Sequence, residues 1–499
     1  MRSKLQTVRL AGQYRRRILF ENFEQLSGFI KEKNIKIVDF KEIDLAGRWH
    51  HLSIPAERFT KELLGKGIGF DGSSYGFMTV EKSDMVFIPD IKSAFADPVS
   101  DVPAVSMIGD IYKINGSSYE RYGGDPRYIA QKAEKYLADS GISDRCVFGP
   151  EFEFYILDNA EFRIEPRNIE VHLDSAQAEW NTINSAYDDC GKNRGYKVMA
   201  HKGYHADSPH DITFDLRNRI VCLLEENGVP VKYHHHENGG PGQVEIEVNF
   251  STLCEIGDRT QKLKYLVKNT AFKYGKTVTF MPKPFYGEAG SGMHVHLQMF
   301  KDGNPVFYDK DGYSGLSKTA LYAIGGILRH SPALMGFTNP STNSYKRLVP
   351  GYEAPVSICY ATANRSAVIR IPGYTIEPGD KRFEFRPPDA ASNPYLCYTA
   401  ILMAAMDGIK NKIDPSAEGY GPYDKNMYKL TEEEKKKVKA LPASLDEAAN
   451  AMEKDHGFLL AGGVFSEEII NSQLAAIRRD AEEVSIIPHP VEFRKYFDL

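Results

Sequence analysis

The sequence is poor in cysteine and tryptophan, and it contains no long hydrophobic segment. Its six cysteines are scattered through 499 residues without a CxxC pair, and it has only two tryptophans. We therefore expect neither a disulfide framework nor a cysteine zinc site. The most apolar stretch, residues 395–406, is shorter than the roughly 20 residues that cross a bilayer. These absences favour a protein of the reducing cytoplasm with no membrane partner.

Neither sign of charge dominates, because 62 Lys and Arg residues face 67 Asp and Glu residues, for a net charge of −5. This balance gives no overall basic field for nucleic acid. Only the first 20 residues are strongly basic, with six Lys or Arg and no acid. They lack the apolar core of a secretory signal. We expect an arm that packs on a neighbouring subunit, with a transit peptide as the alternative.

Two short motifs suggest other functions but fail on their context. Gly275-Lys276-Thr277 resembles the end of a phosphate-binding loop, but the glycine required five residues earlier is Thr270, and a helical pattern precedes the motif. Residues 234–236 are three consecutive histidines. Adjacent residues on a strand point to opposite faces, so these three cannot all bind one zinc ion.

The hydrophobic patterns predict an α+β fold and not a regular alternation of strands and helices. Residues 36–115 are rich in short strand-like runs, and the polar, glycine-rich residues 115–125 indicate a boundary. Asp125 and Pro126 then have the residue types of a helix N-cap and first turn. The predicted strands include 36–40, 85–88 and 105–111, and the predicted helices include 126–140, 260–274, 316–334, 393–412 and 467–484, with a capping box at 431–434.

Four segments alternate apolar and ionisable residues with a period of two. In a strand this period places the apolar side chains on one face and the ionisable ones on the other. For any single strand a solvated polar face is the simpler explanation, but four such strands with histidines among them favour a shared site. The ionisable positions are Glu151 and Glu153; Gln243, Glu245 and Glu247; His294 and His296; and Arg382, Glu384 and Arg386.

Carboxylates that face one another in a partly buried cluster raise each other's pKa, and divalent cations remove that conflict. Sites rich in carboxylates with an occasional imidazole suit Mg²⁺ or Mn²⁺. Arginines add groups that bind carboxylate and phosphate with paired hydrogen bonds. The combination indicates phosphoryl transfer that involves an acidic substrate. The arginines in question are Arg347, Arg365, Arg370, Arg382 and Arg386.

The chain resembles the class I, bacterial-type glutamine synthetases over about residues 38–493. The resemblance rests on several motifs together: Phe70-Asp-Gly-Ser-Ser74, Gly149-Pro-Glu-Phe-Glu-Phe154, His234-His-His-Glu237, Met281-Pro-Lys-Pro284, Gly290-Ser-Gly-Met-His294 and the segment 339–355.

The resemblance implies a fold and an assembly. An N-terminal arm and helix would occupy residues 1–34 and a β-grasp domain residues 35–120. A catalytic domain with a curved antiparallel sheet and surrounding helices would occupy residues 121–499 and end in a C-terminal assembly tail that docks on a partner subunit. The subunits would form a homododecamer of two stacked six-membered rings, with each active site shared by two subunits.

The resemblance also implies an activity, the ATP-dependent ligation of ammonia to L-glutamate through a γ-glutamyl phosphate, with two or more Mg²⁺ or Mn²⁺ ions per site. Asp71, from the neighbouring subunit, would remove a proton from ammonium, and the loop that carries Glu353 would exclude water from the intermediate. The implied roles are as follows: metal ligands Glu151, Glu153, Glu237, Glu245, His294 and Glu384; ammonium site Asp71, Ser74, Tyr204, Glu237 and Glu353; glutamate site Gly290, Arg347 and Arg386; ATP site Phe250, His296, Arg365, Arg370 and Arg382, with Arg365 also neutralising the transferred phosphoryl group.

Two other functions share parts of this pattern. A γ-glutamyl ligase for amines or polyamines would keep the metal and ATP motifs, whereas Asp71 and Ser74 favour ammonia. A non-catalytic structural relative would have lost metal or arginine positions, and none is lost here. Tyr428 corresponds to a tyrosine that some bacterial relatives adenylylate, but the acid that follows it there is Lys429 here. We therefore expect an ordinary surface tyrosine.

Overall fold

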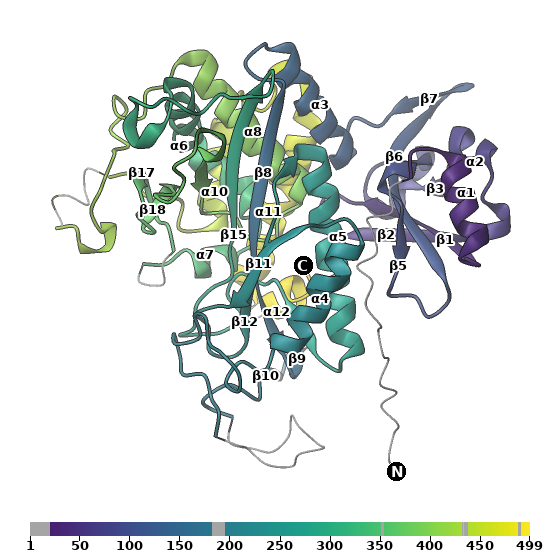
Figure 1. The fold of residues 1–499 in the computed structure, drawn as a ribbon, viewed down its shortest axis with the longest axis horizontal. Helices are drawn as coiled ribbons and strands as arrows, with labels where there is room; N and C mark the ends of the chain where they lie inside the picture. Colours follow the sequence, from purple (N-terminus) through teal and green to yellow (C-terminus); the bar gives the residue numbers. More distant parts are fainter. Residues whose placement is uncertain (1–19, 182–194, 351–353, 432, 434–437, 488–490) are drawn as a thin grey trace.

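The protein is described by a computed structural model, which covers residues 20–181, 195–350, 354–431, 433, 438–487 and 491–499. It consists of a small sheet with two helices beside a larger sheet surrounded by helices (Figure 1). The small part contains α1 (Phe23–Glu32), β1 (Ile37–Ile43), β2 (Trp49–Pro55), α2 (Lys61–Lys66), β3 (Ile68–Asp71), β4 (Asp84–Pro89), β5 (Phe95–Asp97), β6 (Ala104–Asn115) and β7 (Ser118–Arg121).

The small sheet has the strand order β2-β1-β6-β4-β3, with β5 and β7 paired to β6. Strands β1 and β6 run parallel at its centre, and the other pairs are antiparallel. Val38 and Phe40 of β1 point to one face, where they pack with Leu26 of α1 in a buried cluster. This is the expected β-grasp domain. The polar segment predicted as a boundary contains β7, because its residues continue the β6 hairpin.

The large sheet has ten strands, and its main path is β11-β12-β8-β15-β19-β18-β17. Its pairs are antiparallel except for β17 and β18. The expected catalytic fold is therefore confirmed. The strands are β8 (Arg145–Leu157), β11 (Val231–His236), β12 (Gln243–Val248), β13 (Ser251–Thr252), β14 (Thr277–Thr279), β15 (Met293–Lys301), β16 (Asn304–Pro305), β17 (Ser357–Thr362), β18 (Ala367–Ile371) and β19 (Phe383–Phe385), and a separate hairpin holds β9 (Asn159–Glu165) and β10 (Asn168–Asp174).

The helices pack on the apolar side of this sheet and on one another in one continuous core. The predicted helices are all present, but α5 begins seven residues earlier than expected, because it follows β13 directly. The capping box predicted at 431–434 lies largely outside the described residues. The helices are α3 (Pro126–Asp139), α4 (Phe214–Glu226), α5 (Leu253–Lys273), α6 (Lys318–Thr338), α7 (Ser344–Arg347), α8 (Pro394–Asn411), α10 (Leu445–Lys454), α11 (Glu467–Ile486) and α12 (Glu492–Tyr496). No helix in the described ranges is long and apolar enough to span a bilayer.

Arg127 joins the two parts of the molecule. Its guanidinium lies 2.7 Å from both Asp90 and Asp110 of the small domain, and 3.1 Å from Asp258 on α5. The side chain is only 6% exposed. Ion pairs of this kind are retained only where several partners compensate for the loss of water, and here three carboxylates do so. The small domain is therefore held against α5 in one orientation.

A second buried charge in the small domain lacks such partners. Glu42 on β1 is 1% exposed, and neither of its carboxylate oxygens has a hydrogen-bond partner among the described residues. Burial, and after it the charge of Asp125, raise the pKa of Glu42 from its usual 4.5 to about 8. At neutral pH the side chain is mostly an uncharged acid.

This position predicts a pH-dependent stability. Because the folded protein holds the Glu42 proton more tightly than the unfolded chain, stability falls as the pH rises from about 4.5 to about 8. Leucine has no carboxyl group to ionise, so the stability of the variant does not fall in this way. The free energy of unfolding of Glu42→Leu minus that of the wild type should therefore increase by roughly 2–3 kcal/mol between pH 6 and pH 9. Denaturant unfolding at a series of pH values measures it. Glu57→Leu, at an exposed site, is the control, and an advantage of Glu42→Leu that does not change with pH would contradict the prediction.

Candidate functional site

Two adjoining cavities lie over the ionisable face of the large sheet. The larger has a volume of about 770 Å³ and the smaller about 60 Å³. Both are lined by Glu151, Glu237, Glu245, Arg365 and Arg386, so they form one continuous space, which we call the funnel. The predicted residues therefore converge on one site.

The strand register places the predicted acids opposite one another. Glu245 of β12 pairs with Glu153 of β8, and Glu247 pairs with Glu151. On the other side of β8, His294 of β15 pairs with Glu151. Opposite residues in an antiparallel pair have neighbouring side chains. The funnel floor is therefore made of rows of acids and imidazoles that run across the strands.

Three groups of side chains in the described part of the chain have ligand atoms close enough to hold a cation. The atoms of each group lie within 4.8 Å of one another, and no ion is included in the structure. Glu237 and Glu245 form the first group with His235, and Glu153 is the cross-strand neighbour of Glu245. The groups are His235, Glu237 and Glu245; Glu151, His294 and Glu384; and Glu151, Glu247 and His296.

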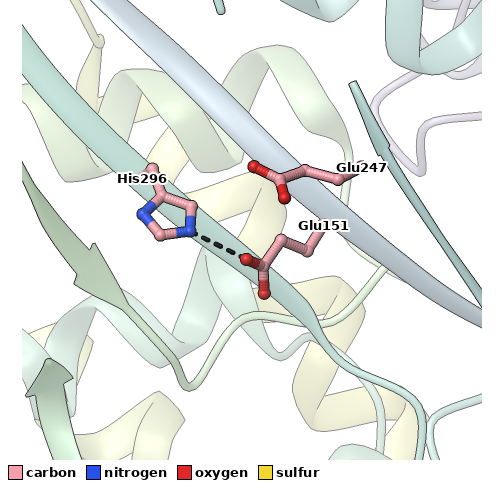
Figure 2. A group of neighbouring side chains, drawn as sticks. All are labelled: Glu151, Glu247 and His296. Carbon is pink, nitrogen blue, oxygen red and sulfur yellow. Dashed lines mark hydrogen bonds and ion pairs between the residues drawn. The ribbon is translucent and has the colours of Figure 1, made fainter. Parts of the chain in front are cut away.

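The second group matches one predicted set of metal ligands in full. The Nδ1 atom of His294 lies 3.0 Å from Glu151 and 3.6 Å from Glu384. The third group shares Glu151, whose Oε1 lies 2.9 Å from Nε2 of His296, and the Glu247 carboxylate lies beside this pair (Figure 2). The first oxygen of Glu247 pairs with the Lys232 ammonium at 2.6 Å, and its second oxygen is buried without a hydrogen-bond partner among the described residues. A divalent cation fits such donors, because it supplies the missing partner and offsets their charge.

The carboxylates differ in their electrostatic surroundings. Burial comes first, followed by the charge of Glu153, and together they raise the pKa of Glu237 to about 8. Burial and then Glu151 and Glu153 likewise raise the pKa of Glu245. Burial also disfavours the charged form of Glu384, but the positive charges of Arg386, His296 and His294 together outweigh it and lower that pKa to about 2. Glu237 and Glu245, whose charged forms are destabilised by burial and by neighbouring acids, therefore have the greatest electrostatic need for a cation.

Arginines also line the funnel. Arg386 and Arg370 both bind Glu384, at 2.5 and 2.7 Å. Arg347 is buried, and its guanidinium donates to the Pro387 carbonyl at 2.7 Å. Arg365 lines both cavities and is exposed. The funnel thus contains positive groups as well as carboxylates, a combination that suits an anionic substrate.

Three residues of the predicted ATP site, Phe250, His296 and Arg382, lie near one another. The Phe250 ring lies 6.1 Å from the His296 ring, and the Arg382 guanidinium lies 5.5 Å from the Phe250 ring. Tyr374 lies at 5.6 Å from the same guanidinium and lines the larger cavity. An exposed aromatic ring beside a guanidinium is a surface on which a base can stack.

Asp71 and Ser74, two residues of the predicted ammonium site, do not line the funnel of their own chain. Asp71 is on β3 of the small domain, exposed, and is not among the residues that line the funnel of its own chain. Its carboxylate accepts hydrogen bonds from the Ser73 and Ser74 hydroxyls at 2.7 and 2.9 Å.

Tyr204 lines the larger cavity and Gly290 the smaller one. Glu353 and the side chain of Tyr428 lie outside the described residues.

Two residues of the candidate cation-binding groups had no predicted role, namely Glu247 and His235, of which His235 lines the larger cavity. Glu247 belonged to an alternating strand, and His235 was set aside with its two neighbours because adjacent histidines cannot share one ion. In the structure His235 pairs with Glu245, and its Nε2 atom lies 3.5 Å from that carboxylate. The period of two did place His235 on the opposite face from His234 and His236. The sequence does not show that β11 pairs with β12, and this pairing brings His235 next to Glu245.

Comparisons with known proteins agree with this geometry. Residues 34–114 match the sequence family "Glutamine synthetase, beta-Grasp domain", and residues 123–496 match "Glutamine synthetase, catalytic domain". The chain is 46% identical to a glutamine synthetase of Aquifex aeolicus over 479 residues, which are 95% of this chain and 99% of that one. It is 44% identical to one of Mycobacterium tuberculosis over 471 residues, 94% and 97% of the two chains. A cryo-EM structure of Plasmodium falciparum glutamine synthetase is 27% identical, superposes with a TM-score of 0.85, and covers 97% of this chain and 100% of its own.

Proposed function

Since this chain belongs to the glutamine synthetase family, we propose that its funnel joins ammonia to the side-chain carboxylate of L-glutamate, using ATP, through a γ-glutamyl phosphate. The chain is a glutamate–ammonia ligase of the bacterial type. The observation that carries the residue assignment is the set of cross-strand rows of buried acids and imidazoles that line one cavity together with arginines.

The acids would hold two or more Mg²⁺ or Mn²⁺ ions. Glu153, Glu237 and Glu245 would bind one ion, and Glu151, His294 and Glu384 another; His235 and Glu247 lie beside these two sets. The ions would neutralise the charge of the phosphates and of the glutamate carboxylate. Support comes from the raised pKa of Glu237 and of Glu245, since carboxylates that burial and like charges destabilise gain most from a cation.

Arginine side chains of the protein would bind the anionic groups of glutamate and ATP. A carboxylate is a poor electrophile, so the glutamate side chain must first accept a phosphoryl group. Arg347 and Arg386 would hold glutamate, Arg365 would stabilise the charge on the transferred phosphoryl group, and Arg370 would contact ATP. Phe250, His296 and Arg382 would hold ATP at the adenine end. All of these groups lie along the funnel or directly beside it.

Asp71 would remove the proton from ammonium, because only free ammonia attacks the acyl phosphate. Hydrogen bonds from Ser73, first, and from Ser74 lower the pKa of Asp71 and keep it ionised. The distance of β3 from this chain's own funnel supports a site completed by a second copy, in which Asp71 of one subunit, with Ser74, serves the funnel of its neighbour beside Tyr204 and Glu237. The proposed assembly is a homododecamer of two stacked six-membered rings.

A single assay tests the function. Phosphate release should require ATP, Mg²⁺ or Mn²⁺, L-glutamate and ammonium together, and mass spectrometry should show glutamine as the product. A panel of amines at equal concentration, including methylamine, ethanolamine and putrescine, should give much lower rates than ammonium. An amine turned over faster than ammonium would replace this proposal with the amine-ligase function.

A further inference from the structure

The C-terminal helix α12 packs on the catalytic domain of its own chain. Phe493 and Tyr496 are buried with Met281, and Val171 and Leu173 of β10 cover them. The described part of the C-terminal segment therefore lies beside the funnel-forming loops. Its expected contact with a partner subunit stays a prediction.

Glu492, at the start of α12, is a buried carboxylate that is 4% exposed. It accepts hydrogen bonds from the Thr342 hydroxyl at 2.7 Å and from the Asn343 amide at 3.1 Å. The Lys346 ammonium lies 2.6 Å from it. Tyr496, one turn later, adds contacts of 3.3 and 3.2 Å to the Thr342 backbone and hydroxyl. One carboxylate thus gathers three donors from five consecutive residues.

These donors belong to the segment that carries Arg347. Helix α7 is four residues long, too short to be stable without tertiary contacts. Arg347 ends this helix, and its guanidinium fits between the Pro387 carbonyl, at 2.7 Å, and His294, at 3.3 Å. A Cβ atom on Gly292 would lie 2.3 Å from the same guanidinium, so the space around it is closely fitted.

A second connection runs through Asn343 to the glycine-containing loop of the funnel. The Asn343 side chain accepts a hydrogen bond from the Lys283 backbone N–H at 2.6 Å and donates one to the Lys283 carbonyl at 3.1 Å. Gly290, at the other end of that loop, packs on the aliphatic part of Arg347. Glu492 is therefore hydrogen-bonded to a side chain that also holds the loop at Lys283 and that belongs to the residue directly before α7.

We propose that Glu492 is a positioning residue for the glutamate end of the active site, which it reaches through Asn343 and α7 without touching the substrate. This inference rests on the proposed function, in which Arg347 binds glutamate. Loss of the carboxylate leaves Thr342, Asn343 and Lys346 without their shared partner, so α7 can shift. Small displacements of a substrate-holding group have large kinetic effects.

Steady-state kinetics of the intact enzyme test the proposal. Glu492→Ala should raise the KM for glutamate roughly tenfold, while the KM for ATP and the thermal unfolding temperature remain close to the wild type. Glu492→Gln keeps one acceptor oxygen and should give an intermediate value. The matched control is Lys495→Ala on the same helix, because Lys495 binds Asp480 and Glu483 of α11 and not the α7 segment. It should leave the KM for glutamate unchanged.

Arg347→Ala separates this inference from the proposed function. Its KM for glutamate should rise further, and adding Glu492→Ala to it should produce no additional rise, because both changes act on the same contact. If Arg347→Ala raises the KM and Glu492→Ala does not, the positioning role is wrong and the proposed function survives. If Glu492→Ala changes all KM values and the unfolding temperature together, or Lys495→Ala has the same effect, Glu492 is a structural residue only. An unchanged KM in Arg347→Ala would overturn the glutamate assignment itself.

Discussion

Glu245→Gln is expected to reduce glutamine formation by roughly 10²–10³-fold or more, the loss typical of removing one strong electrostatic contact in a preorganised site. Glu245 is buried between Glu153 and His235 on neighbouring strands, and its two neighbours cannot take its place as a ligand without moving their strands. Glutamine keeps the size of the side chain but removes the charge that would bind Mg²⁺ or Mn²⁺. Activity over a range of metal concentrations measures the loss.

The same substitution should make the metal-free protein more stable. The wild-type carboxylate is buried among acids, and burial and these like charges raise its pKa, so its removal relieves repulsion. In excess chelator the unfolding temperature of Glu245→Gln should therefore exceed that of the wild type, and added Mg²⁺ should stabilise the variant less. Glu161→Gln, on the exposed hairpin strand β9, is the control for the chemical change alone. Full activity of Glu245→Gln, or of the wild type in excess chelator, would rule out the metal assignment.

Asp71→Asn should reduce glutamine formation by roughly 10²–10⁴-fold, the usual contribution of a general base. ATP binding should change little, because Asp71 lies outside the funnel of its own chain. The residual rate should rise with pH as free ammonia becomes more abundant. Initial rates between pH 6.5 and pH 9, with nucleotide binding measured separately, test both expectations. The control is Asp84→Asn, since Asp84 is the exposed cross-strand partner of Asp71.

Mixed assemblies test whether Asp71 serves a neighbouring subunit. Neither Asp71→Asn nor Glu245→Gln subunits should be active alone. If each site takes Asp71 from one subunit and Glu245 from the next, equal mixing after dissociation should restore up to about a quarter of the sites. No recovery in a mixture shown by mass spectrometry to contain both subunits would mean that both residues act within one chain.

Two ionisable side chains, one in the small domain and one that contacts it, are buried with very different partners. Arg127 fixes the domain against α5 through three carboxylates, whereas Glu42 has no such partner in the part of the chain that the structure describes. Tyr75 follows directly after Ser74, and its ring stacks on that of His50, the cross-strand partner of Glu42. The His50 side chain thus connects Glu42, whose charged form is destabilised by burial, to Tyr75, which follows Ser74 in the turn after Asp71.

The sequence by itself determined the local features of this protein. Period-two alternation placed Glu151 and Glu153 on one strand face, and Asp125 with Pro126 marked the start of α3, because these signals depend only on neighbours along the chain. The motifs from Phe70 to Pro355 pointed to the family. Most of the predicted funnel residues were found in this way before any strand pairing was known.

Only the tertiary structure decided which faces meet. Alternation says which side of a strand a residue occupies, but the partner across the sheet depends on register, and a shift of one residue reverses the face. The pairing of β11 with β12 therefore brought in His235, and that of β12 with β8 brought in Glu247. The contacts of Glu492 with Thr342, Asn343 and Lys346 join segments about 150 residues apart. Such contacts leave no periodic signal in the sequence, because they arise from how separate elements pack.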